Sequence, residues 1–307
     1  MNPALVPTYR PLTEADLQAA TYVRKAASES LARAEGREPW AWQPRGPAAN
    51  MHLLHNDPGG SWAAEIDGLL VGYSQALVRG DIWYLGQLFV QPEVHGLGIG
   101  REVLHRAQEY GRARGARVFA VVSSTSPVAQ GLYMRAGMFP LGIAYHIGGP
   151  VEALRALPEP SGSRKRIVDC EGWQERIGVL DRAVFGAERP ADHALSLSWN
   201  TVYEATESFA VVRDGEFRGY AYADTGGIIG PVAAWEPEEQ LPLLRMAGDW
   251  LAEREVGEAR MLLISTNRVV MRALLERRWR IARWNFFLAS EAFGQFDRYV
   301  PSGGLLL

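Results

Sequence analysis

The residues best placed to do chemistry are His95-Gly96-Leu97-Gly98-Ile99-Gly100. They lie between an apolar run that ends at Val90 and an amphipathic stretch, so we expect them to join a strand to the N-terminus of a helix. Backbone N–H groups at a helix N-terminus bind anions, and glycines allow a ligand to approach the main chain closely. These residues therefore predict an anion site, although a tight strand-to-helix turn would use glycines in the same way.

Several other kinds of site do not fit the sequence. No Gly-Lys-Ser/Thr follows the loop, as a Walker motif requires, and no clear acidic residue stands about 20 positions on, as in a dinucleotide fingerprint. Cys170 is the single cysteine and no Cys/His cluster has zinc-ligand spacing, so we expect no metal and a structural role for Cys170. The net charge is −3, which argues against a nucleic-acid partner.

A second motif follows the glycine-rich loop. Ser126 and Pro127 are typical of the start of a helix, and Ala129, Leu132-Tyr133 and Gly137-Met138 come after them. The two motifs, in this order and spacing over residues 8 to 148, resemble the pyrophosphate loop and the CoA-side helix of the GNAT acetyltransferase superfamily. His95 stands where relatives have arginine or glutamine, and Ser126 stands where they have asparagine.

The resemblance implies acetyl-CoA as cosubstrate and a primary amine, on a small molecule or a peptide, as acceptor. In the family the strand before the loop splays from its neighbour, and its backbone pairs with the pantetheine arm. By position, the residues that would bind the cofactor are Leu88, Phe89, Val90, His95, Gly96, Leu97, Gly98, Ile99, Gly100, Arg101, Ser126, Ala129 and Tyr133.

The resemblance also implies catalytic roles. Tyr133 matches the tyrosine that protonates the departing thiolate. Gln87 stands where many relatives have a glutamate base, and glutamine cannot accept a proton, so a water relay near Gln87 is the first hypothesis for deprotonating the amine. Other candidates for the base are Glu93, Asp81, Tyr84 and His146, although a solvated or structural role would account for each of them.

Two further segments are candidates for contact with the acceptor. Trp40 and Trp42 precede a helical segment with His52 and His55, in a region that often lines the acceptor pocket of relatives, although core packing or a surface loop would explain these residues at least as well. Near the end of the chain, Tyr299 is a hypothetical substrate contact.

The first half predicts a mixed α/β fold around these motifs. We expect strands at residues 8–11, 61–66, 69–79, 82–90, 117–122 and 141–146, with a tight turn at Asp67-Gly68. Helices are expected from Thr13 onward and at residues 99–114 and 126–136.

The second half repeats this pattern. Ser61-Trp62-Ala63, Asp67-Gly68 and Gly72-Tyr73 match Ser208-Phe209-Ala210, Asp214-Gly215 and Gly219-Tyr220, each pair 147 positions apart. This spacing predicts a tandem duplication. The second copy lacks the glycine loop, since Trp235 to Pro242 contains three glutamates, and Leu274 takes the place of Tyr133, although Asn267 is kept. We therefore expect a degenerate copy that binds no cofactor.

The whole chain of 307 residues is long enough for two domains. We expect an α/β protein of two tandem GNAT-like domains, each a mostly antiparallel central sheet flanked by helices. The catalytic domain spans residues 1–156, a linker 157–165, and the degenerate domain 166–307. That second domain would complete the acceptor pocket, stabilise the first or form a homodimer. With no apolar targeting or membrane-spanning run, a cytoplasmic location is expected. A non-catalytic acyl-CoA sensor and a purely structural tandem protein stay open as alternatives.

Overall fold

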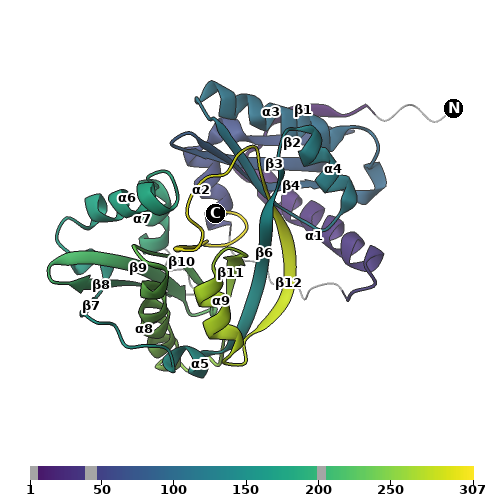
Figure 1. Ribbon diagram of the computed structural model, residues 1–307. Helices are drawn as coiled ribbons and strands as arrows, with labels where there is room; N and C mark the ends of the chain where they lie inside the picture. Colours follow the sequence, from purple (N-terminus) through teal and green to yellow (C-terminus); the bar gives the residue numbers. More distant parts are fainter. Residues whose placement is uncertain (1–5, 39–46, 199–204) are drawn as a thin grey trace. The chain divides into compact units, whose positions relative to one another are not determined.

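The computed structural model describes residues 6–38, 47–198 and 205–307. The chain forms two compact units (Figure 1). The first unit comprises Met1–Val121 and Ser126–Met138, and the second comprises Val122–Thr125 and Phe139–Leu307. Both mix helices with mostly antiparallel strands, as the sequence predicts.

The sheet of the first unit has the order β1-β2-β3-β4-β5. Its strands are β1 (Thr8–Pro11), β2 (Ser61–Ile66), β3 (Leu69–Arg79), β4 (Ile82–Val90) and β5 (Val118–Ser123), the last of which ends in the second unit. All neighbours are antiparallel except β4 and β5, which are parallel. The predicted hairpin turn is confirmed: Asp67 and Gly68 both have positive φ, 51° and 76°.

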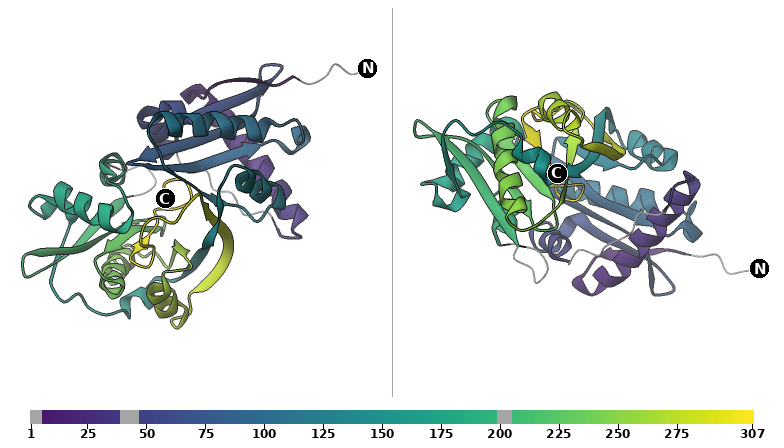
Figure 2. Two further views of the ribbon diagram at one scale, coloured as in Figure 1. Left: turned by 45° about the horizontal axis from the view of Figure 1, so that its top comes forward. Right: turned by 90° about the horizontal axis from the view of Figure 1, so that it is seen from below.

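Helices cover both faces of this sheet, because successive strand residues point to opposite sides. Ala63 packs with Ala20 and Val23 of α1, whereas Ala64 packs with Ile99 and Val103 of α3. Figures 1 and 2 show α1 and α3 on opposite faces. The helices and turns of the unit are η1 (Glu14–Asp16), α1 (Leu17–Ala34), α2 (Ala48–Asn56), η2 (Pro58–Gly60), η3 (Pro92–Val94), α3 (Ile99–Ala113) and α4 (Pro127–Arg135).

The second unit contains two groups of paired strands. One has the order β12-β6-β11 and the other β13-β10-β9-β8-β7. The strands are β6 (Phe139–Pro150), β7 (Ser163–Lys165), β8 (Thr206–Arg213), β9 (Glu216–Asp224), β10 (Ile229–Ala234), β11 (Glu258–Ile264), β12 (Arg280–Ala289) and β13 (Tyr299–Val300). The helices and turns are α5 (Val151–Arg155), η4 (Ile167–Asp169), α6 (Trp173–Val184), α7 (Pro190–Ser198), η5 (Pro237–Glu239), α8 (Gln240–Ala252) and α9 (Arg268–Leu275).

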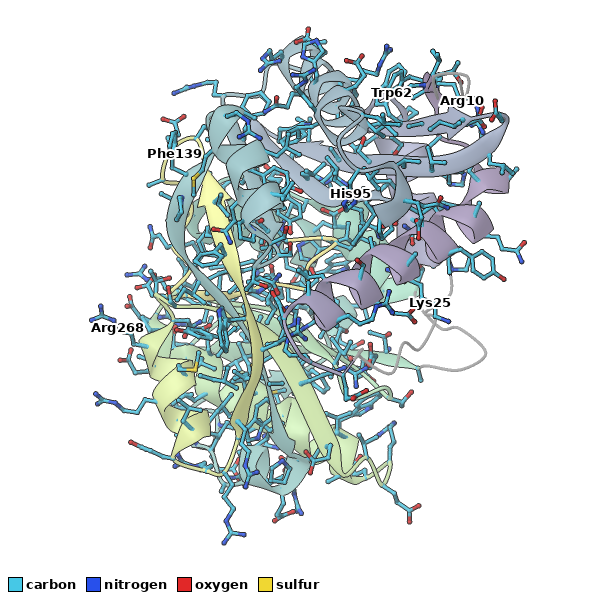
Figure 3. All side chains as sticks on the ribbon, turned by 90° about the vertical axis from the view of Figure 1, so that its right-hand side faces the viewer. Arg10, Lys25, Trp62, His95, Phe139 and Arg268 are labelled. Atoms are coloured by element: carbon cyan, nitrogen blue, oxygen red, sulfur yellow. The ribbon has the colours of Figure 1, made fainter. Side chains whose placement is uncertain are left out.

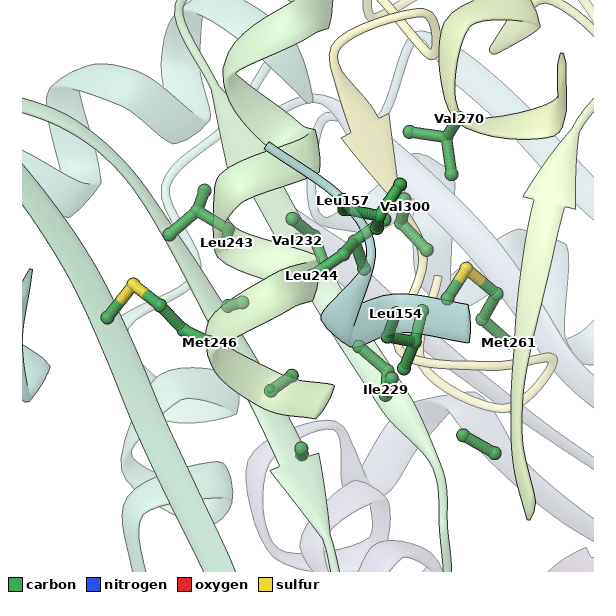
Figure 4. Close-up of a cluster of buried hydrophobic side chains, with 14 of the residues drawn as sticks. Leu154, Leu157, Ile229, Val232, Leu243, Leu244, Met246, Met261, Val270 and Val300 are labelled. Atoms are coloured by element: carbon green, nitrogen blue, oxygen red, sulfur yellow. The ribbon is translucent and has the colours of Figure 1, made fainter. Parts of the chain in front are cut away.

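Packing divides the chain at Met138 rather than within residues 157–165. The strand β6, predicted at 141–146 but longer, pairs with β11 and β12 of the second unit. Leu154 and Leu157 are buried beside Leu244 of α8 in the second core (Figure 4). The expected linker therefore begins in a core and ends in β7, which pairs with β8. The domain boundaries 1–156 and 166–307 follow from the duplicated sequence pattern, and they stay a prediction.

The two copies of the repeat also pair their strands in the same register. Ala63 lies opposite Tyr73 in the β2–β3 hairpin, and the matching Ala210 lies opposite Tyr220 in β8–β9. Both hairpins have a register shift at the same place, after Ala64 and after Val211. Asp214 and Gly215 also repeat the turn conformation, with φ of 53° and 79°.

None of the described helices combines the length and apolar character needed to cross a membrane. The cytoplasmic location stays a prediction.

Candidate active site

The centre of the candidate site is the end of β4, where this strand separates from β5. Parallel pairing between them ends at Leu85 opposite Val121, yet β4 continues to Val90. On its other side β4 remains paired with β3, with Tyr73 opposite Phe89. A register shift leaves Gly86 without a partner residue on β3 and bends the strand there. Past Leu85, no strand among the described residues pairs with this edge of β4, which is called its open edge below; it covers the three residues predicted to meet the pantetheine arm, Leu88, Phe89 and Val90.

The predicted anion loop follows directly. Its backbone turns at Gly96 and Gly98, whose φ angles are 88° and 79°, a conformation that other residues rarely adopt. Gly98 precedes α3, and the first hydrogen bond of the helix joins Glu102 N–H to the Gly98 carbonyl at 3.1 Å. The N–H groups of the first turn, from Ile99 to Arg101, precede this bond and are the donors that a helix start offers to an anion.

His95 connects this loop to β4. Its Nε2 lies 3.2 Å from the Val90 carbonyl, and since a carbonyl only accepts, Nε2 donates. Figure 3 shows His95 on the loop before α3. Leu97 is 43% exposed, and Arg101 is exposed in the first turn of α3, where its positive charge would favour a phosphate. The site can thus hold an anion through both backbone and charge.

The second motif lies next to the first. Ser126 caps α4, and its side chain accepts a hydrogen bond from Ala129 N–H at 3.4 Å. A Cβ built on Gly100 would lie 3.7 Å from Leu132 of α4 and the same distance from Leu88 of β4. The start of α3, the end of β4 and α4 therefore meet within the first unit.

Tyr133 follows Leu132 on α4 and is 5% exposed. Burial raises the pKa of its phenol above the ordinary value near 10. The hydroxyl therefore carries its proton throughout the neutral range, as a general acid must.

Gln87 is buried on β4, and its side chain is already engaged: Oε1 accepts a hydrogen bond from the Tyr73 hydroxyl. Tyr73 is buried as well. Sequence reasoning missed this partner, although Tyr73 belongs to one of the repeated pairs. The contact fixes the orientation of the Gln87 amide.

The other candidate bases are dispersed. Glu93 is exposed on η3, Asp81 lies 3.9 Å from Arg117, and Tyr84 is fully buried. His146 lies on β6 in the second unit, where its Nε2 donates to Asn285 Oδ1 at 3.0 Å. Burial and the neighbouring Arg283 lower the pKa of His146 to about 4, so its ring is neutral at pH 7.

The predicted acceptor-lining residues have other roles where they are described. His52 is buried beside Asn56 on α2, and His55 pairs with Glu14 at 2.6 Å on the surface. Trp40 and Trp42 lie outside the described residues. Tyr299 is fully buried in the second unit, and its hydroxyl donates to the Leu307 carbonyl at 2.9 Å. That burial leaves Tyr299 no path to a substrate.

The loop of the second copy differs, as expected. Between β10 and α8 the chain forms the turn η5, and the Glu239 carboxylate there accepts hydrogen bonds from Arg213 and Arg218 at 3.0 and 2.9 Å. The turn thus carries an ion-paired carboxylate in place of the glycines of the first copy. Within the described ranges, no three His, Cys, Asp or Glu side chains are grouped to hold a metal ion.

Comparisons with known proteins agree with this geometry. Residues 26–138 match the acetyltransferase (GNAT) family. No curated protein matches the sequence. Among solved structures, a candidate acetyltransferase from Pyrococcus horikoshii is similar with a TM-score of 0.73 and 16% identity, over 98% of this chain and 94% of that one.

Two other solved structures share the fold over most of their length. A GCN5-related N-acetyltransferase from Sphaerobacter thermophilus has a TM-score of 0.62 and 17% identity, covering 92% of this chain and 95% of its own. A tandem GNAT protein from the clavulanic acid biosynthesis pathway has a TM-score of 0.61 and 17% identity, covering 92% of this chain and 98% of its own. At these identities the likeness concerns the fold alone.

Proposed function

We propose, from the match of residues 26–138 to the acetyltransferase (GNAT) family, that the chain is an acetyl-CoA-dependent N-acetyltransferase. The acceptor is a primary amine on a small molecule or a peptide. The observation that supports this most is the open edge of β4 beside the N-terminus of α3, with the protonated Tyr133 on the adjoining helix.

The residues of the first unit fit the cofactor. The N–H groups at the start of α3, with the Arg101 guanidinium, would bind the pyrophosphate, and His95 holds the loop against β4. The backbone of Leu88, Phe89 and Val90 would pair with the pantetheine arm, beside the Val90 carbonyl that already accepts a hydrogen bond from His95. Ser126 and Ala129 form the first turn of the helix on the CoA side. Acetyl-CoA, when bound, supplies an activated thioester.

Transfer then depends on position and proton movement. A backbone N–H of β4 directed at the thioester oxygen would stabilise the negative charge that develops during amine attack. Holding the amine against the thioester removes much of the entropic barrier. Tyr133, which is protonated at neutral pH, would give its proton to the departing thiolate and would regain one from the proton that the amine releases.

The amine must reach the thioester without its extra proton. Gln87 cannot accept that proton, and its Oε1 accepts a hydrogen bond from Tyr73. We therefore assign to Gln87 the role of positioning a water that carries the proton away. Glu93 is the other candidate, and its exposed place on η3 would suit the outer end of such a relay.

Calorimetric titration with acetyl-CoA tests the cofactor site, with saturable binding of one molecule per chain as the expected result. No saturable binding would refute the proposal. Release of free thiol is then measured with a panel of amines, amino acids and peptide N-termini. Binding without thiol release across the panel would favour an acyl-CoA sensor instead, a role consistent with a glutamine rather than a carboxylate at position 87.

A further inference from the structure

The second unit contains a groove that corresponds to the open edge of β4. A parallel bridge joins Ile228, directly before β10, to Arg260 of β11, and Arg260 N–H donates to the Gly227 carbonyl at 2.7 Å. Beyond that bridge β10 continues to Ala234. The two strands therefore separate after a short parallel contact, as β4 and β5 do.

Strand register shows that β10 corresponds to β4. Tyr73 lies opposite Phe89, and its repeat Tyr220 lies opposite Ala233. In both strands a register shift lies N-terminal to this pair of residues, at Gly86 in β4 and between Ile229 and Val232 in β10. Ala233 thus takes the place of Phe89, one of the three residues expected to meet the pantetheine arm.

In the second unit this groove is filled by the chain itself. The short strand β13 pairs with the end of β10, with Tyr299 opposite Ala233 and Val300 opposite Val232. Ala234 N–H also donates to the Arg298 carbonyl at 3.1 Å. On its other side β13 contacts β11, so it lies between the two separated strands.

Two buried amide side chains hold the backbone of this segment. Gln240, at the start of α8, donates to the Asp297 carbonyl at 2.7 Å. Asn267, which caps α9, donates to Gln240 at 2.9 Å and to the Tyr299 carbonyl at 3.4 Å. Both residues are fully buried. The helices α8 and α9 correspond to α3 and α4, so the elements that carry the cofactor motifs in the first unit here bind peptide carbonyls.

Side chains of the same segment are buried with its backbone. Val300 lies in the core of the second unit near Val232 and Leu244 (Figure 4). The Tyr299 hydroxyl accepts a hydrogen bond from Arg189 at 2.5 Å. At Gly230 a Cβ would lie 2.4 Å from the Pro301 carbonyl, which shows how closely the two backbones approach. An extended peptide with an aromatic residue at the Tyr299 position would make the same contacts.

We propose that the second unit keeps the ligand groove of its fold as a peptide-binding groove, occupied in cis by residues 297–301. Backbone pairing with β10 gives affinity, as in other cases of strand addition, and the buried Tyr299 gives specificity. The comparison with a cofactor arm rests on the proposed function, but the peptide contacts themselves do not.

A nicked protein tests this inference. A protease site placed in the exposed Ser290–Ala292 segment of the full chain would allow residues 293–307 to be cut free after folding. We expect the fragment to co-elute with the protein and to exchange with a labelled synthetic peptide of the same sequence. If removal of the fragment unfolds the second unit, added peptide is expected to restore its far-UV circular dichroism.

Matched peptides and a protein variant define the specificity. A Tyr299→Ala peptide should bind at least about tenfold more weakly, because it loses a buried ring and a hydrogen bond. An Asp297→Ala peptide should bind like the wild type, since the contact at 297 is made by the backbone. In the nicked protein, Gln240→Ala should weaken binding by about tenfold.

A fragment that leaves without loss of structure and does not rebind would overturn the proposal, as would equal binding of a scrambled peptide. These measurements use no acetyl-CoA, so their failure is distinct from failure of the proposed enzymatic activity.

Discussion

At the scale of single residues, the glycines of the loop differ in what they contribute. Gly98 has a positive φ of 79°, but a Cβ there would meet only the Arg101 side chain, at 3.6 Å. Gly100 lies inside the helix, where a Cβ would make ordinary contacts at 3.7 Å. The requirement at Gly98 therefore concerns backbone conformation, whereas Gly100 has room for a methyl group.

This difference predicts opposite outcomes for two alanine variants. Gly98→Ala should cost about 1–2 kcal/mol, because a residue with a Cβ is strained in the left-handed region. A loop that relieves this strain loses its anion-binding shape, so acetyl-CoA should bind about tenfold more weakly by calorimetry. Gly100→Ala should bind within about twofold of the wild type. Equal affinities for the two variants would contradict this account of the loop.

Tyr133 allows a second prediction at this scale. Tyr133→Phe removes the proton donor while keeping the ring that packs in the core, so kcat should fall by about 100-fold while acetyl-CoA affinity stays the same. Because burial raises the pKa of Tyr133, the wild-type rate should show no loss from its ionisation up to about pH 10. Unchanged turnover in the variant would remove Tyr133 from the mechanism.

At the scale of elements, the two copies use the same device to begin corresponding helices. Ser126 caps α4 through Ala129 N–H, and Asn267 caps α9 through Val270 N–H at 3.3 Å. Ser126→Ala should lower the free energy of unfolding by about 1 kcal/mol and weaken acetyl-CoA binding, because α4 starts beside the cofactor loop. Ser126→Asn, the residue of the second copy, should retain both properties in urea unfolding and calorimetry. Loss of stability in the asparagine variant alone would be inconsistent with a capping role.

Sequence patterns predicted the elements of the first unit well, since the signals are local. The hairpin at Asp67-Gly68, the end of β4 at Val90 and the start of α3 at Ile99 all lie where expected. The cap of α4 at Ser126 was likewise predictable, because a serine followed by proline is a local helix-start signal.

Long-range pairing was beyond sequence reasoning. The partners of β6 are β11 and β12, more than 100 residues later in the chain, as Ile147 opposite Met261 illustrates. The sequence of β6 predicts a strand but does not identify its partners. In the same way, Tyr73 contacts Gln87 only because β3 and β4 are neighbours, and Tyr299 is held by groups from three distant segments.

At the scale of the whole molecule, the second unit has a buried ionic centre of its own. Asp181, Arg189 and His193 are each at most 4% exposed, with Asp181 Oδ2 at 3.0 Å from Arg189 and 2.8 Å from His193. Arg189 also binds the hydroxyls of Tyr220, at 2.9 Å, and Tyr299. The ionic centre thus joins α6, α7, β9 and the segment that fills the groove.

Asp181→Asn should strongly destabilise the second unit, because it leaves the Arg189 charge buried without its counter-ion, at a cost of about 3–5 kcal/mol. The control is Asp249→Asn. Asp249 pairs with Arg155 and Arg164 at the surface, where such a change should cost less than about 1 kcal/mol. Urea unfolding at pH 7 measures both variants, and similar losses would show that the buried pair has no special role.

The same centre predicts how stability depends on pH. Burial alone would raise the pKa of Asp181, but the Arg189 guanidinium and the bond with His193 lower it below the ordinary value. A carboxyl whose pKa is lower in the folded than in the unfolded protein stabilises the fold above its unfolded pKa of about 3.9, and this contribution is lost as the pH falls further.

The wild type should therefore lose stability steeply below about pH 4. Asp181→Asn, which has no proton to gain at this position, should lose less over the same range, so the difference between the two proteins should narrow on acidification. A difference that stays constant from pH 7 to pH 3 would mean that the charge of Asp181 does not stabilise the second unit.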